Sequence, residues 1–204
     1  MFAYIEAAGW PIWPLLLASV IALAIIGERA WSLRTGAVAP KNLLEQVIED
    51  YRHGAINPQT LTQLAQGSPL GQIFATGLRN SRSSPLVMKE ALEDTGRAVT
   101  YELERFLTTL GTIASISPLL GLLGTVIGMI EIFGSQTPSG GNPIILAHGI
   151  SVALYNTAFG LSIAVVCMIA HVFLHTRGKN IQHDLESTTE RVFNLLTVSS
   201  KSGY

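Results

Sequence analysis

Two hydroxyl groups lie inside otherwise apolar stretches of this chain and are its leading candidates for chemistry. Thr125 lies in SPLLGLLGTVIGMIEIF at 117–133, and Thr157 lies in AHGISVALYNTAFGLSIAV at 147–165. A threonine in a membrane helix often bonds the carbonyl one turn back, or joins helices for about 0.6 kcal/mol. Its hydroxyl can also line a polar path through the membrane. Both interpretations stay open on the residue pattern alone.

Three further polar residues, Asn156, Ser151 and Glu131, are candidates to support such a path. An amide in hydrocarbon must find partners, so Asn156 serves either the path or the contact between helices. Glu131 lies near the end of its stretch, where solvation suffices to explain it. It lies about 120° from Thr125 at about 100° per residue, so we do not place it in the same pathway.

Small residues surround both threonines. Each glycine in a helix costs roughly 0.5–1 kcal/mol relative to alanine, so their number here indicates a need for close contact between helices. We expect 117–133 to be a packing surface between subunits, with a bend at its proline. The residues assigned to helix packing are Pro118, Gly121, Gly124, Gly128, Gly149 and Gly160.

Other chemistries find no support in the sequence. The single cysteine, Cys167, excludes a disulfide within the chain, and the five histidines show no metal-ligand spacing. The glycines of 121–128 lie inside an apolar span, so they do not form a phosphate-binding loop. The sequence has no nucleophile elbow and no nucleic-acid-binding patch. We therefore expect no enzyme activity, no metal, no cofactor and no nucleic-acid partner.

Three membrane spans are predicted to carry these residues. The chain is 48% hydrophobic and 13% charged, whereas a typical soluble domain is about 25% charged. All 13 Lys and Arg residues lie in 29–105 and 177–201, which leaves spans at about 10–31, 110–133 and 144–174. Glu6 and the lack of basic residues before the first apolar run indicate a retained span and not a signal peptide.

The basic residues also predict the direction of the spans, because they should lie in the cytoplasm. The expected division is 1–33 for the outer N-terminus and first span, 34–109 for a cytoplasmic helical loop, 110–133 for the second span, 134–143 for an outer loop, 144–174 for the third span, and 175–204 for a cytoplasmic helical tail. Glu28 and Arg29 end the first span, where a surface ion pair or snorkelling explains them.

The cytoplasmic parts are expected to be helical. Helix starts are marked by an N-cap residue followed by proline at Asn57-Pro58, Ser68-Pro69 and Ser84-Pro85. Gly54 can end a helix over 42–53.

Apolar residues at spacings of three and four predict one uninterrupted helix over 85–133. A similar stripe continues the third span into the tail, through Ile181, Leu185, Thr188, Val192 and Leu195. The predicted fold is all-α, with three transmembrane helices, two of which extend far into the cytoplasm.

The two apolar stretches together resemble the signatures APLLGLLGTVxGM and GIxxALxxTxxGLxxAI of the MotA/TolQ/ExbB proton-channel family. The opening GWPIWPLLLASVIALAIIGERAW resembles the shorter ExbB proteins. The resemblance implies a pentameric ring of this chain in the bacterial inner membrane, surrounded by lipid, with a dimer of a single-span ExbD-type partner in its pore. In the family, threonines of the second and third spans face the partner's proton-carrying aspartate, and they map to Thr125 and Thr157. Proton flow would then drive a TonB-type protein and import across the outer membrane.

Two departures from the family pattern leave other functions open. Many members carry a glutamate where this chain has Val152, and the usual proline of the third span is absent at 165–167. Both departures would make a proton path depend more on the partner and on the threonines. One alternative is a TolQ-like stator of the Tol-Pal envelope system. Another is a non-conducting membrane scaffold for the partner.

Overall fold

The computed structural model describes residues 9–40, 43–53, 56–81, 83–134 and 143–201, and every regular element in these ranges is a helix. The helices are α2 (Ile12–Ser32), α3 (Thr35–Val38), α4 (Leu43–Arg52), α5 (Pro58–Gly67), α6 (Pro69–Arg79), α7 (Pro85–Glu104), α8 (Leu107–Gly134) and α9 (Pro143–Lys201). The all-α prediction is confirmed for this part of the chain. Gly54 and most of the expected outer loop, 135–142, lie outside the described residues.

The chain divides into two compact units. Unit 1 contains Met1–Glu28 and Phe106–Phe173, and unit 2 contains Arg29–Arg105 and Leu174–Tyr204. Each unit is described by itself below. Unit 1 holds most of the apolar sequence, and unit 2 holds the short helices α3 to α6 together with α7 and the later part of α9.

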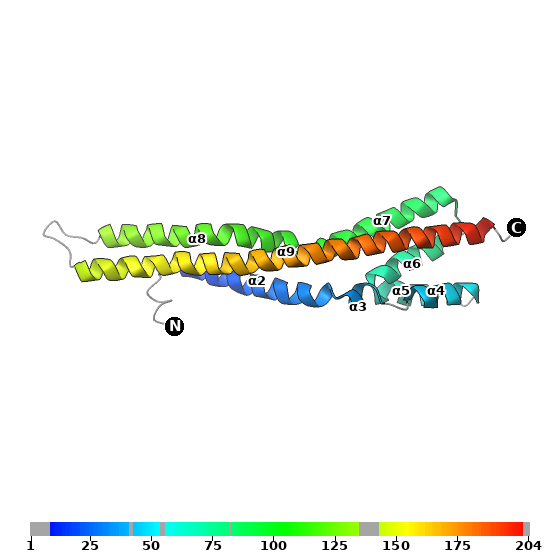
Figure 1. The fold of residues 1–204 in the computed structure, drawn as a ribbon, viewed down its shortest axis with the longest axis horizontal. Coiled ribbons are helices and arrows are strands. Elements are labelled where there is room, and N and C mark those ends of the chain that lie inside the picture. Colours follow the sequence, from blue (N-terminus) through cyan, green and yellow to red (C-terminus); the bar gives the residue numbers. More distant parts are fainter. Residues whose placement is uncertain (1–8, 41–42, 54–55, 82, 135–142, 202–204) are drawn as a thin grey trace. The chain divides into compact units, whose positions relative to one another are not determined.

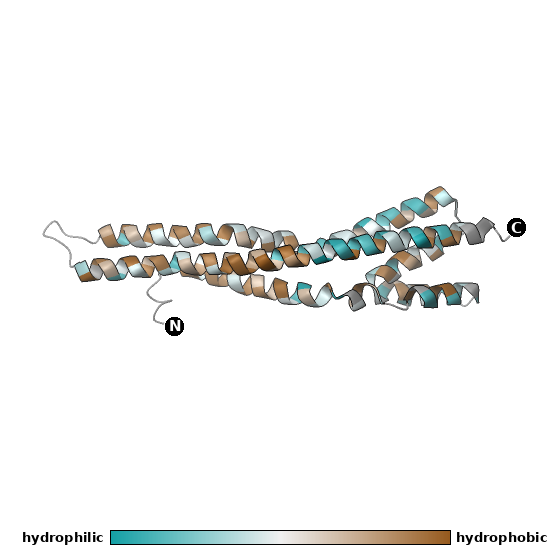
Figure 2. Ribbon diagram, in the orientation of Figure 1, coloured by the Kyte–Doolittle hydropathy of each residue, from teal (hydrophilic) through white to brown (hydrophobic). Residues whose placement is uncertain are grey.

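The described residues include three helical segments that are long and apolar enough to cross a membrane. They are Ile12–Ser32, Pro85–Gly134 and Leu146–Thr197. Figure 2 shows hydrophobic residues along α2, α8 and the earlier half of α9, and hydrophilic residues in the later part of α9. The three predicted spans are thus confirmed as apolar helices, and the protein is a membrane protein.

Helices α8 and α9 form an antiparallel hairpin in unit 1, where they lie side by side (Figure 1). The contacts run backwards along α8 as they run forwards along α9, and Gly121 and Gly124 face the adjacent residues Thr157 and Asn156. From the C-terminal end of α8 backwards, the facing pairs are Ile132–Gly149, Gly128–Ala153, Gly124–Asn156, Gly121–Thr157 and Ser117–Gly160. The glycines therefore pack against the other span of the same chain, and the expected surface between subunits stays a prediction.

The prediction of one uninterrupted helix over 85–133 is wrong at one point. Helix α7 ends at Glu104, and α8 begins at Leu107. Between them Phe106 has a φ of 65°, in the left-handed region that residues other than glycine rarely adopt. Neither glycine nor proline marks this break, so the usual sequence signals for the end of a helix are missing.

The three predicted helix starts in unit 2 are confirmed. Ser68 caps α6, because its Oγ accepts a hydrogen bond of 3.0 Å from the N–H of Gly71. Ser84 caps α7 in the same way, with a distance of 3.4 Å from the N–H of Val87 to its Oγ. Helix α5 also begins at its predicted proline, but the side chain of Asn57 makes no capping hydrogen bond. These starts depend on local chemistry, which explains why the sequence predicts them well.

Helices α6, α7 and the later part of α9 share a core in unit 2. A Cβ added to Gly77 of α6 would lie 3.3 Å from Leu196 and 3.5 Å from both Leu92 and Val192. The apolar stripe of α9 shifts by one residue near its end, since Leu196 is 6% exposed and Leu195 is 49% exposed. A helix with about 3.6 residues per turn drifts away from a strict repeat of about 3.5, which explains the shift.

Candidate functional site

The structure brings the hydroxyls of Thr125 on α8 and Thr157 on α9 into hydrogen-bonding contact through their Oγ1 atoms. Thr125 Oγ1 also lies 3.2 Å from the carbonyl oxygen of Gly121 and 3.2 Å from that of Ala153. Thr157 Oγ1 lies 3.1 Å from the same Gly121 carbonyl oxygen. Both threonines are half-buried. We call Thr125 and Thr157 the hydroxyl pair.

The hydroxyl pair has more acceptors within reach than protons to donate. Each hydroxyl carries one proton and two acceptor lone pairs. The protons of the pair can go to the carbonyls of Gly121 and Ala153 or to the other hydroxyl. Rotation about the Cβ–Oγ bond therefore exchanges one acceptor for another. Such a pair can join two helices, and it can also pass a proton by accepting one on a lone pair and releasing another.

The two polar candidates on α9, Asn156 and Ser151, are placed differently. Asn156 is 1% exposed and packs against Gly124, where an added Cβ would lie 3.0 Å from Asn156 Cγ and Nδ2. Ser151 is exposed, and its hydroxyl donates to the carbonyl of Ala147 one turn earlier at 3.0 Å. The structure thus brings Asn156 close to the hydroxyl pair and leaves Ser151 on the exposed side of α9.

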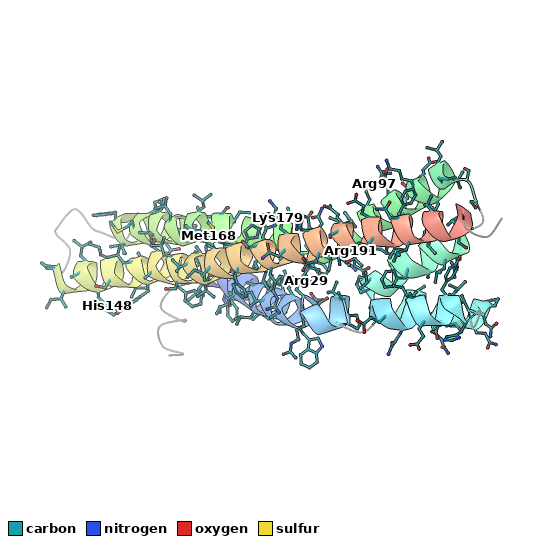
Figure 3. The ribbon with its side chains drawn as sticks, turned by 45° about the vertical axis from the view of Figure 1, so that its right-hand side comes forward. Arg29, Arg97, His148, Met168, Lys179 and Arg191 are labelled. Carbon is teal, nitrogen blue, oxygen red and sulfur yellow. The ribbon has the colours of Figure 1, made fainter. Side chains whose placement is uncertain are left out.

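Glu131 lines a cavity of about 300 Å³ in unit 1. The walls come from the segment before α2, from α8 and from α9, and they include His148, Val152 and Asn156. Glu131 and His148 are exposed, whereas Asn156 is buried. Figure 3 shows His148 near the beginning of α9. Glu131 therefore shares a cavity with Asn156, and neither threonine of the hydroxyl pair lines that cavity.

Close approach of the two spans positions the hydroxyl pair. A Cβ on Gly121 would lie 2.8 Å from the carbonyl oxygen of Asn156, and one on Gly160 would lie 2.5 Å from that of Ser117. Pro118 lies inside α8, next to Ser117 of the Ser117–Gly160 contact, and does not end the helix. A larger side chain at either glycine would force the backbones apart and separate the hydroxyls.

Sequence reasoning missed the part played by Arg29. This residue is 5% exposed, and its Nη1 donates to the carbonyl oxygens of Glu102 at 3.0 Å and Leu103 at 3.4 Å. In an uninterrupted helix these carbonyls would accept from the N–H groups of Phe106 and Leu107. The guanidinium replaces these donors at the break between α7 and α8. The interpretation of Arg29 as a surface or snorkelling charge is therefore wrong.

His171 makes a second polar contact that the sequence did not predict. Its Nδ1 lies 2.9 Å from the carbonyl oxygen of Leu107, and a Cβ on Gly111 would lie 3.2 Å from its Cε1. The ring thus joins α9 to the start of α8. Within the described ranges, no group of three or more His, Cys, Asp or Glu side chains could hold a metal ion.

The hydroxyl pair lies in a region shared with known proteins. The sequence model of the MotA/TolQ/ExbB proton channel family matches residues 65–187, which include the pair and exclude Arg29. The chain is 34% identical over 166 residues to the biopolymer transport protein named ExbB-like 3 of Synechocystis sp., an alignment that covers 78% of each chain. It is 28% identical over 165 residues to ExbB-like 1 of Synechocystis sp., covering 79% of this chain and 65% of that protein. It is 29% identical over 200 residues to the biopolymer transport protein exbB1 of Vibrio cholerae serotype O1, covering 92% of this chain and 84% of that protein.

Proposed function

Because the chain belongs to the MotA/TolQ/ExbB proton channel family, we propose that it is the proton-channel subunit of an ExbB-type stator. In this role it couples inward proton flow to TonB-dependent import across the outer membrane. A TonB-type client is favoured over the Tol-Pal system because the similar proteins are named as ExbB biopolymer transport proteins.

One observation carries this proposal, namely the hydroxyl pair where two apolar spans meet. A polar contact between membrane helices contributes only about 0.6 kcal/mol on average, so helix association alone is a weak reason for the pair. Its shared acceptors allow the protons of Thr125 and Thr157 to change partners, which supports a role in proton transfer.

The proposed assembly is a pentameric ring of this chain around a dimer of a single-span ExbD-type partner in the bacterial inner membrane. The family relationship supports the ring and the partner. The membrane aspartate of the partner would exchange protons with the hydroxyl pair. An outer N-terminus and a cytoplasmic C-terminus are supported by the basic residues, since all of them lie in 29–105 and 177–201.

Proton uptake into liposomes that contain the chain and its partner tests the role of the hydroxyl pair. The substitutions Thr125→Val and Thr157→Val together should lower the initial uptake rate about 100-fold, because positioned proton-transfer groups typically contribute at least this much. Serine at both positions should retain uptake, because serine keeps the hydroxyls. Valine is close to threonine in shape, so the helices should still assemble.

Thr112→Val is the matched control on α8. Thr112 is exposed, and its hydroxyl donates to the carbonyl of Thr108 in its own helix at 2.9 Å. This variant should keep the wild-type uptake rate. Unchanged uptake in the double valine variant would disprove the role of the hydroxyl pair. A similar loss in Thr112→Val would mean that uptake follows helix integrity and not the pair.

A second candidate function is a non-conducting scaffold for the partner. Val152 favours it, because this residue places an apolar side chain in the cavity where many family members carry a glutamate. Each hydroxyl of the pair also has a carbonyl acceptor within the chain, as a purely structural contact requires. The scaffold predicts no proton uptake by the wild-type complex under any imposed gradient.

A further inference from the structure

The walls of the cavity in unit 1 combine exposed side chains with buried residues next to the hydroxyl pair. Glu131 and His148 lie at its exposed side, and Ala153 and Asn156 form part of its wall. We propose that this cavity is a water-filled vestibule in which Glu131, together with His148, collects protons for the hydroxyl pair. The inference rests on the proposed proton-channel function and assigns the residues that supply its outer side.

Glu131 and His148 lie at the same level of the hairpin. Their next neighbours along the chain are in contact, because a Cβ on Gly149 would lie 2.6 Å from Ile132 Cδ1. Both side chains are exposed and line the same cavity. Among the described residues that line the cavity, no other side chain is acidic or basic. The mouth of the vestibule therefore has one carboxylate and one imidazole.

Two wall residues of the vestibule adjoin the hydroxyl pair, although Thr125 and Thr157 do not themselves line the cavity. Ala153 lines the cavity, and its carbonyl oxygen lies 3.2 Å from Thr125 Oγ1. Asn156 also lines the cavity and directly precedes Thr157. The helical angle that separates Glu131 from Thr125 does not oppose this route, because the route follows the space between two helices and not one helix face.

The size and lining of the cavity favour water as its content. Its volume of about 300 Å³ exceeds the roughly 30 Å³ that one water molecule occupies in the liquid, so several molecules fit. Cavities that stay dry are lined by apolar groups. This cavity has a carboxylate, an imidazole and an amide in its walls, and its glycines leave room beside them.

Proton collection at Glu131 needs no further reactant. The carboxylate accepts a proton from hydronium at the mouth and releases it to water in the cavity, so the side chain returns to its starting state. A neutral His148 ring can do the same through one ring nitrogen. The negative charge of Glu131 also raises the local concentration of cations. In charged clefts this increase is about tenfold or more.

Thiol accessibility tests for water in the vestibule without any measurement of transport. Val152→Cys and Leu154→Cys are each made in the full complex with Cys167→Ala, which removes the native thiol. Val152 lines the cavity, whereas Leu154 is 55% exposed on the apolar side of α9. A membrane-impermeant thiosulfonate added from the outer side should modify Val152→Cys at least about tenfold faster, because thiolates form in water and not in hydrocarbon. Equal rates, as a dry or lipid-filled cavity would give, overturn the inference.

Proton uptake then tests the collecting role of Glu131. Glu131→Gln should lower the initial rate about tenfold at alkaline external pH, where hydronium is scarce, and the deficit should narrow at acidic pH. Glu131→Asp should behave as the wild type. A deficit of equal size at both pH values, or no deficit, overturns the inference. If the double valine variant of the hydroxyl pair blocks uptake and Glu131→Gln does not, the vestibule inference fails and the proposed function stands. Unchanged uptake in both variants refutes the proposed function.

Discussion

Replacement of Arg29 by methionine should open the break between α7 and α8. Arg29 is almost fully buried and donates from Nη1 to the carbonyl oxygens of Glu102 and Leu103. Methionine has a similar length but no donor, so both carbonyls lose this partner. The backbone near Phe106 is the part of the chain that should respond, because its φ of 65° needs support from its surroundings.

The magnitude follows from the geometry of these contacts. A hydrogen bond that involves a charged group contributes about 1.5–3 kcal/mol, and the bond at 3.0 Å is of this kind. A cation at a helix C-terminus adds about 0.3–1 kcal/mol. Methionine avoids the cost of burying a charge, so we expect a net loss of about 2–3 kcal/mol. The equilibrium constant for local opening should then rise about 30- to 150-fold.

Amide hydrogen exchange of the full complex measures this local opening. Residues 102–110 should exchange faster by the stated factor in Arg29→Met, while the middle of α9 should keep its rate. Arg97→Met is the control, since Arg97 is on α7 and pairs with Asp94 while both side chains are largely exposed. Exposed pairs contribute at most about 1 kcal/mol. If both variants accelerate exchange equally, Arg29 does not hold the break.

Two further predictions concern backbone positions. Gly160→Ala should lower the thermal midpoint of the complex, because the new Cβ would lie 2.5 Å from the Ser117 carbonyl oxygen and cost about 1–3 kcal/mol. In Gly27→Ala the new Cβ in α2 would meet no atom within 4 Å, so this variant should leave the midpoint unchanged or raise it. A lower midpoint for Gly27→Ala than for Gly160→Ala would contradict the close contact of Gly160 with Ser117. Phe106→Gly should be more stable than Phe106→Ala by about 1 kcal/mol, because both remove the ring but only glycine adopts a positive φ freely. Equal midpoints in chemical denaturation would show that the break is not strained.

The spans and the helix starts could be predicted because each depends on a signal contained in a short stretch. Apolar runs that are free of charge indicate a span whatever the rest of the chain does. The serine caps at Ser68 and Ser84 act on donors only three residues away. Such features do not require knowledge of which helices are neighbours.

The break at Phe106 could not be predicted because the side chain that bonds to the end of α7 lies far away in the sequence. Arg29, which supplies donors to the end of α7, is 73 residues before Glu102. Its position at the end of an apolar run is typical of a snorkelling charge. Nothing in the neighbouring sequence distinguishes a snorkelling arginine from a buried one. The stripe of apolar residues that continues across 105–106 describes a helix face but does not show that the backbone stays helical.

The contact partners of the hydroxyl pair also required the structure. Periodicity places Thr125 and Thr157 each on a face of its own helix, but the register of the hairpin determines which faces meet. The facing pairs Gly128–Ala153 and Ser117–Gly160 show that register. The same register brings Glu131 to a cavity wall opposite α9, which a helical wheel of α8 alone cannot show.

The small residues of the hairpin provide acceptors as well as close approach. Hydrocarbon offers no water to a polar side chain, so a hydroxyl between spans must find its acceptor in the protein. Thr157 reaches the carbonyl of Gly121, and Thr125 reaches that of Ala153, across the contact between the helices. These carbonyl oxygens already accept a hydrogen bond within their own helices and offer the hydroxyls their second lone pair. A bulky side chain at Gly121 or Ala153 would cover that lone pair. The small residues are therefore part of the same site as the hydroxyls, and a change at Gly121 should affect the pair even where the helices still assemble.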